Sequence, residues 1–254
     1  MIIYLSLVAI FFSSMVYGII GFGDALVLIP IITPIIGIKN AVILVNIWGT
    51  LPAFLNFIKY RKLLDKGYFF RFLLFGIPAT ILGTYLIINI LVEWIELVLG
   101  IFIFIYSSLK LLKYYKEPEN FEVKNVINTT SPLVLYGGFS YGLLTGLISA
   151  AGPINVAILE KTGHYRESFI ENFAAIGTVL SVSRIPLYFI GNIFPYDLII
   201  VFFLAFPIIF IGTKLGQQIT PKISARKFEI IIFLFLFVIS IKSIITSSIS
   251  LLIA

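Results

Sequence analysis

Apolar segments separated by short polar stretches recur along the whole chain. Six of them have roughly the length of one membrane-spanning helix, about 20 residues, and two exceed one span but fall short of two. This pattern predicts an all-α polytopic membrane protein, which we expect in the plasma membrane. The predicted segments are 2–36, 40–58, 68–90, 94–112, 132–160, 168–190, 196–216 and 228–252.

The two halves of the chain resemble each other. Their clearest shared motif is Pro-x4-Gly-Thr, in "IPATILGT" (77–84) and "FPIIFIGT" (206–213). We therefore predict a duplicated unit of four segments, with a first transmembrane repeat at 1–116, a cytoplasmic linker at 117–131 and a second repeat at 132–254. Further pairs in the same order are Gly18 with Gly146, Asn46 with Asn172, Gly49 with Gly177, and Thr50 with Thr178.

Positive charge is distributed oppositely in the corresponding loops of the two halves. Loop 59–71 carries five Lys and Arg residues and its counterpart 190–198 carries none, whereas loop 87–97 carries none and its counterpart 214–227 carries four. Since Lys-rich and Arg-rich loops stay in the cytoplasm, this reversal predicts two repeats of opposite orientation. Inverted repeats are typical of secondary transporters.

Inversion requires an odd net number of membrane crossings in each repeat, which four full spans would not give. The first segments, 2–36 and 132–160, are the two long ones, and each contains helix breakers near its middle, "GIIGFGD" and "SAAGP". We predict that both are re-entrant hairpins, broken at these motifs, that enter and leave the membrane on one side. Both termini then lie outside the cell.

The breaks themselves predict a binding site for an anion. A helix that restarts inside the membrane presents free N–H groups and the positive end of its dipole. Gly21 and Gly23 allow the turn and a close approach of a ligand to the backbone, and Ala151 and Gly152 lie at the second break. We expect the two tips to meet near the bilayer midplane. Close helix packing through small residues is the alternative explanation.

Two charged residues inside the apolar segments require an explanation, because intramembrane charges are costly. Arg184 is either a structural arginine that extends its head group toward the interface or a ligand of the anion. Asp24 is either the N-cap of a helix or a titrating group that couples a proton to the substrate.

Neutral polar residues complete the predicted site. The matched pairs of asparagines and threonines fit either substrate contacts or interhelical hydrogen bonds. His164, in the turn "EKTGHYRES", is predicted to be a solvated loop residue, with a gating or pH role as the alternative. The predicted substrate-binding residues are Gly21, Gly23, Asp24, Asn46, Thr50, Ser149, Ala151, Gly152, Asn155, Asn172, Thr178 and Arg184.

Composition argues against several other functions. The chain is 60% hydrophobic and 12% charged, without cysteine and with one histidine, so we expect neither a metal site nor a cofactor. Its net charge of +6 lies between the apolar segments, which indicates cytoplasmic loops rather than nucleic-acid binding. No Ser–His pair, acid dyad or Walker motif is recognisable, so we expect a transporter driven by a gradient and no enzyme. The expected partners are a small anion, the lipid bilayer and a coupling proton.

"GIIGFGDALVLIP" (18–30), followed by "NAVILVNIWGTLPAFLNF" (40–57), resembles the opening of the sulfite exporter TauE/SafE family of membrane permeases. "YGLLTGLISAAGP" (141–153) is similar to the glycine pattern that this family repeats. The likeness extends over essentially the whole chain. It implies export or exchange of small sulfur-containing anions, such as sulfite or organosulfonates. An anion channel and a permease for another small organic anion are the alternatives.

The sequence departs from the family pattern at both breaks. Asp24 and Ala25 stand where the family tends to have glycines, as do Ser149, Ala151 and Pro153 in the second half.

Overall fold

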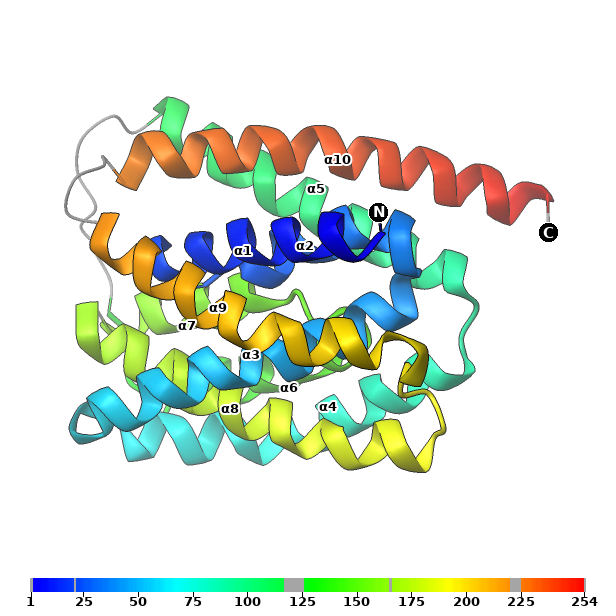
Figure 1. Ribbon diagram of the computed structural model, residues 1–254. Coiled ribbons are helices and arrows are strands. Elements are labelled where there is room, and N and C mark those ends of the chain that lie inside the picture. Colours follow the sequence, from blue (N-terminus) through cyan, green and yellow to red (C-terminus); the bar gives the residue numbers. More distant parts are fainter. Residues whose placement is uncertain (1, 21, 117–125, 165, 220–224, 254) are drawn as a thin grey trace. The chain divides into compact units, whose positions relative to one another are not determined.

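The computed structural model describes residues 2–20, 22–116, 126–164, 166–219 and 225–253, and helices account for nearly all of them (Figure 1). The predicted all-α class is confirmed for these ranges. Gly21 and most of the predicted linker, 117–125, lie outside them. The elements are α1 (Ile2–Ile20), α2 (Asp24–Ile36), α3 (Ile38–Tyr60), η1 (Arg61–Leu63), α4 (Lys66–Asn89), α5 (Val92–Lys116), α6 (Pro132–Ile148), α7 (Gly152–Lys161), α8 (Arg166–Ile190), η2 (Tyr196–Leu198), α9 (Ile199–Ile219) and α10 (Ala225–Ile253).

Six helical stretches in the described ranges are long and apolar enough to cross a membrane. They correspond to the six segments predicted as single spans, so the chain is a multi-pass membrane protein. The long first segments contain shorter apolar helices, Tyr4–Ile19, Asp24–Ile36 and Pro132–Ile148. Their re-entrant course remains a prediction. The six stretches are Ile38–Leu63, Lys66–Ile87, Glu93–Lys116, Glu167–Ile190, Tyr196–Gln218 and Phe233–Leu252.

Both long segments are broken at the predicted motifs. Between α1 and α2, Gly23 has φ 91° and ψ 0°, a left-handed conformation that glycine adopts without a steric penalty. Between α6 and α7, Ser149 has φ 53° and ψ 4° and ends α6. In each case the two helices on either side of the break contact each other.

The helices form two compact units. One comprises α1, α2, α5, α10 and nearly all of α9; the other comprises most of α3 together with α4, α6, α7 and α8. Each unit takes helices from both predicted repeats. The division into compact units does not test where a duplicated unit begins or ends, so the predicted repeat boundaries remain a prediction.

Glycines bring α4 and α6 into close contact within one unit. A Cβ atom added to Gly138, Gly142 or Gly146 on α6 would overlap a backbone carbonyl oxygen of α4. These three positions are spaced four residues apart and therefore lie on one face of the helix. They face the carbonyl oxygens of Phe72, Gly76 and Thr80, in that order.

The other unit contains a helix pair of the same kind, between α1 and α9. A Cβ at Gly18 would overlap the carbonyl oxygen of Thr213, and one at Gly216 would overlap that of Met15. At Gly212 a Cβ would lie 2.8 Å from the carbonyl oxygen of Phe11. The two contacts are of the same kind. In each unit, a helix from the first segment of one predicted repeat (α1 or α6) packs through glycine against the helix of the other repeat that carries Pro-x4-Gly-Thr (α9 or α4).

Candidate functional site

Arg184 lies in the second half of α8, with 1% of its surface exposed. Its guanidinium group donates hydrogen bonds to the side-chain oxygen of Asn46 on α3, to the hydroxyl of Ser149 at 2.9 Å, and to the carbonyl oxygen of Thr145 on α6. Helix α3 and the C-terminal end of α6 therefore both contact this cation of α8 within one unit. The structure thus brings together Arg184, Asn46 and Ser149, three predicted site residues that are far apart in sequence, and adds Thr145, which was not predicted.

Arg184 has no acidic partner among the residues that the structure describes. Its Nε–H also has no hydrogen-bond acceptor there. A buried charge without a counter-ion is costly. The carbonyl of Thr145, in the last turn of α6, compensates part of that cost because the C-terminal end of a helix is partially negative. The site therefore retains positive charge and a free donor.

Ser149 links Arg184 to the break between α6 and α7. Its hydroxyl accepts the bond from Arg184 and donates one to the carbonyl oxygen of Val42 at 3.0 Å. The chain resumes helical structure at Gly152, with the fully buried Ala151 as N-cap. No side chain caps this helix end. The N-terminus of α7 thus begins three residues after the serine that binds Arg184.

Asn46 is held on both sides of its amide group. Its oxygen accepts from Arg184, and its nitrogen lies 3.3 Å from the carbonyl oxygen of Ser181. Thr50 and Thr178 instead donate to carbonyls of their own helices, at 2.9 Å and 2.7 Å. Each of these two hydroxyls therefore donates its proton within its own helix and not to Arg184 or its partners.

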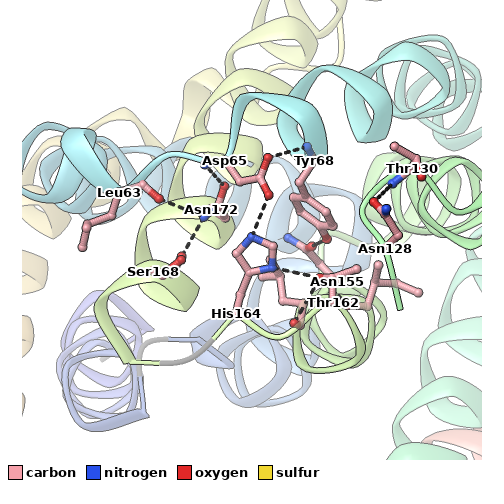
Figure 2. A network of polar contacts seen from close by, with 12 residues as sticks. Leu63, Asp65, Tyr68, Asn128, Thr130, Asn155, Thr162, His164, Ser168 and Asn172 are labelled. Carbon is pink, nitrogen blue, oxygen red and sulfur yellow. Dashed lines mark hydrogen bonds and ion pairs between the residues drawn. The ribbon is translucent and has the colours of Figure 1, made fainter. Parts of the chain in front are cut away.

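Asn155 and Asn172 belong to a second polar cluster, which Figure 2 shows. Asn172 lies about 18 Å from Arg184 along α8, at 1.5 Å per residue. Its side-chain oxygen accepts the backbone N–H of Asp65 at 3.0 Å, and its nitrogen donates to the carbonyl of Ser168 at 2.8 Å. Asn155 accepts a hydrogen bond of 2.7 Å from the Tyr68 hydroxyl. The structure thus places these two asparagines in a different cluster from Arg184, Asn46 and Ser149.

His164 is at the centre of the second cluster, and its prediction as a solvated residue is wrong. It is only 6% exposed, because the turn at Gly163 folds the chain back and the His164 N–H bonds to the carbonyl of Leu159. Nε2 lies 3.4 Å from a carboxylate oxygen of Asp65, and Nδ1 lies 2.9 Å from the Thr162 hydroxyl (Figure 2). Burial lowers the pKa of His164, while the nearby Asp65 carboxylate partly opposes this effect.

Asp24 lies at the break in the other unit, and its prediction as an N-cap is wrong. Gly23 occupies the N-cap position, and Asp24 is the first residue of α2. A carboxylate in the first turn is still favoured by the helix dipole. The alternative role, as a titrating group, remains a prediction.

The family model for sulfite exporter TauE/SafE matches residues 6–243. The chain belongs to this family. Comparisons with curated proteins and with solved structures find no match. TauE/SafE proteins are membrane transporters named for the export of sulfite, which agrees with the six apolar helical stretches of this chain.

The role of Asp65 in this TauE/SafE chain was not predicted from the sequence. Its carboxylate accepts the backbone N–H of Tyr68 at 3.0 Å and so caps α4, besides contacting His164. An aspartate directly before an apolar helical pattern is a recognisable N-cap signal. Its contact with His164 has no local signal, because the two residues are distant in sequence.

Proposed function

We propose that the chain is a secondary transporter that exports small sulfur-containing anions, such as sulfite or organosulfonates, with Arg184 as the principal anion ligand. The observation that carries this proposal is the burial of Arg184 without an acidic partner in the described part of the chain. An anionic substrate would provide the missing negative charge while it is bound.

The chemistry of the Arg184 cluster suits an oxyanion. A guanidinium group presents its N–H donors in a planar fork, which matches oxygen atoms that share one central atom. The Nε–H of Arg184 has no acceptor among the described residues, so it is available to a ligand. The hydroxyl of Ser149 holds the guanidinium group in place, and the nearby N-terminus of α7 adds N–H groups and a positive dipole end.

We also propose that the two repeats are inverted. The reversed charge of the corresponding loops supports this arrangement. The glycine contacts of α1 with α9 and of α6 with α4 support the duplication, because corresponding helices of the two repeats make the same kind of contact.

Counterflow of radiolabelled sulfite in proteoliposomes tests the proposed function. A carrier should exchange internal for external sulfite with saturation, whereas a channel should show no stimulation by sulfite on the opposite side. Loss of charged hydrogen bonds worth about 1.5–3 kcal/mol should weaken sulfite binding in Arg184→Ala by roughly 10- to 100-fold. Arg184→Lys should retain part of the affinity, since it keeps the charge and loses the fork.

Arg71→Ala is the matched control. Arg71 is exposed and donates to the carbonyl of Thr130 at 3.0 Å, so its loss should leave sulfite affinity unchanged. A folded Arg184→Ala protein with wild-type affinity would assign Arg184 to the stabilisation of the α6 terminus and refute the proposed site.

A further inference from the structure

Glu171 is a buried acid that the Arg184 cluster does not use. It lies in the second turn of α8 and is fully buried. Neither of its carboxylate oxygens has a hydrogen-bond partner in the part of the chain that the structure describes. Along the helix it is about 20 Å from Arg184, at 1.5 Å per residue. Within its membrane-spanning stretch, α8 therefore carries a cation without an acidic partner and an acid without a hydrogen-bond partner among the described residues.

Among the described residues, the neighbouring elements provide no ion-pair or hydrogen-bond partner for Glu171. Within this unit α4, α7 and η1 pack against α8. None of the charged or titratable side chains described on these elements or their loops forms an ion pair or hydrogen bond with Glu171, and Asp65 is engaged with His164. At this end of the unit these side chains are Arg61, Lys62, Asp65, Lys66, Tyr68, Arg71, Glu160, Lys161, His164 and Glu167.

An ionised carboxylate is costly in such a place, because the group is inaccessible to solvent and no described residue donates a hydrogen bond to it. A proton removes that cost without any further ligand. A metal cation would need several additional oxygen ligands. The described residues contain no cluster of three or more His, Asp and Glu side chains that could hold a metal ion. The ligand that fits Glu171 is therefore a proton.

We propose that Glu171 is a proton-binding site of the transporter. Its carboxyl group holds a proton while it is buried and releases it to water when the transport cycle exposes it on one side of the membrane. The proton thereby couples the pH gradient to anion movement. This coupling rests on the proposed function, whereas the bound proton does not.

Infrared difference spectroscopy tests the bound proton directly. The wild-type protein at pH 7 should show the carbonyl band of a protonated carboxylic acid, and Glu171→Gln should lack it. Glu167→Gln, which removes an exposed acid one turn earlier on α8, should keep the band. Glu171→Asp should shift the band, which provides a second assignment if Glu171→Gln does not fold. Absence of the band from the wild-type protein would refute the proposal.

Sulfite accumulation in proteoliposomes tests the coupling. With one proton per anion, a gradient of one pH unit can sustain about a tenfold sulfite gradient. Glu171→Gln should lose this accumulation and retain counterflow, since glutamine imitates the protonated acid. Glu167→Gln should behave as wild type. Asp24→Asn, measured in parallel, tests the acid that the sequence suggested for the same role.

The outcomes separate the two proposals. Wild-type accumulation in a folded Glu171→Gln protein would refute the coupling role of Glu171. Absence of sulfite counterflow in the wild-type protein would refute the proposed function, and the infrared band would still decide whether Glu171 binds a proton.

Discussion

Arg184 donates a 2.9 Å hydrogen bond to the hydroxyl of Ser149, whose backbone has the left-handed φ of 53°. Serine rarely adopts this conformation, which costs about 1–2 kcal/mol relative to the right-handed one. A glycine would adopt it freely, yet serine occupies this position although α6 itself contains four glycines. The strained residue thus places a hydroxyl beside the buried cation, which is an arrangement expected at a functional site.

Two substitutions separate the hydroxyl of Ser149 from its backbone strain. Ser149→Ala and Ser149→Gly both remove the hydroxyl, and glycine also relieves the left-handed strain. We expect both variants to bind sulfite several-fold more weakly, because the hydrogen bond that positions the Arg184 guanidinium is lost and such a bond contributes about 1 kcal/mol. Ser149→Gly should be more stable than Ser149→Ala by about 1 kcal/mol. Thermal unfolding in detergent and sulfite titration provide the two measurements. Equal stability of the variants would contradict the assignment of strain.

His164 should make the stability of the protein depend on pH. Because burial lowers its pKa below the value of about 6.5 in an unfolded chain, the unfolded state binds more protons between these two values. Stability should therefore be complete above about pH 6.5 and decrease as the pH falls through that range. His164→Gln should flatten this part of the profile in thermal unfolding measured from pH 5 to 8. As His164 is the single histidine of the chain, no other histidine can produce the difference. Parallel profiles for the two proteins would contradict the prediction.

The glycine contact between α4 and α6 should not tolerate a methyl group. In Gly146→Ala the new Cβ would overlap the carbonyl oxygen of Thr80 and lie 2.8 Å from the backbone nitrogen of Thr84. We expect a loss of about 1–3 kcal/mol in stability, since backbone atoms would have to move.

Gly177→Ala is the matched control for this prediction. Gly177 is also helical, but a Cβ there would meet no atom within 4 Å. Alanine favours the helix over glycine by up to about 1 kcal/mol, so this variant should be at least as stable as the wild type. Equal destabilisation of both variants would mean that the close contact is not the cause.

The pattern of apolar residues predicted the helices correctly, because helix formation here depends on the local sequence. The glycine-rich and small-residue motifs likewise located both breaks, since Gly23 requires a left-handed φ. Contacts between distant side chains had no such signal. Asn46 and Asn172 look equivalent in sequence, yet one binds Arg184 and the other holds the backbone of Asp65. His164 is buried beside Asp65, which is distant in sequence. The polar residues around His164 therefore suggested a solvated turn.

The orientation of the repeats can be tested with single cysteines, because the chain contains none. If the repeats are inverted, cysteines at Lys62 and Gln218 should react with a membrane-impermeant maleimide only from the cytoplasmic side. Cysteines at Asn89 and Asp197 should react only from outside. All four positions are exposed, so a failure to label reports sidedness rather than burial. Detergent-solubilised protein, in which all four should react, is the control. Labelling of Lys62→Cys and Gln218→Cys from opposite sides would show that the repeats are parallel, and the re-entrant course of the broken segments would then lose its basis.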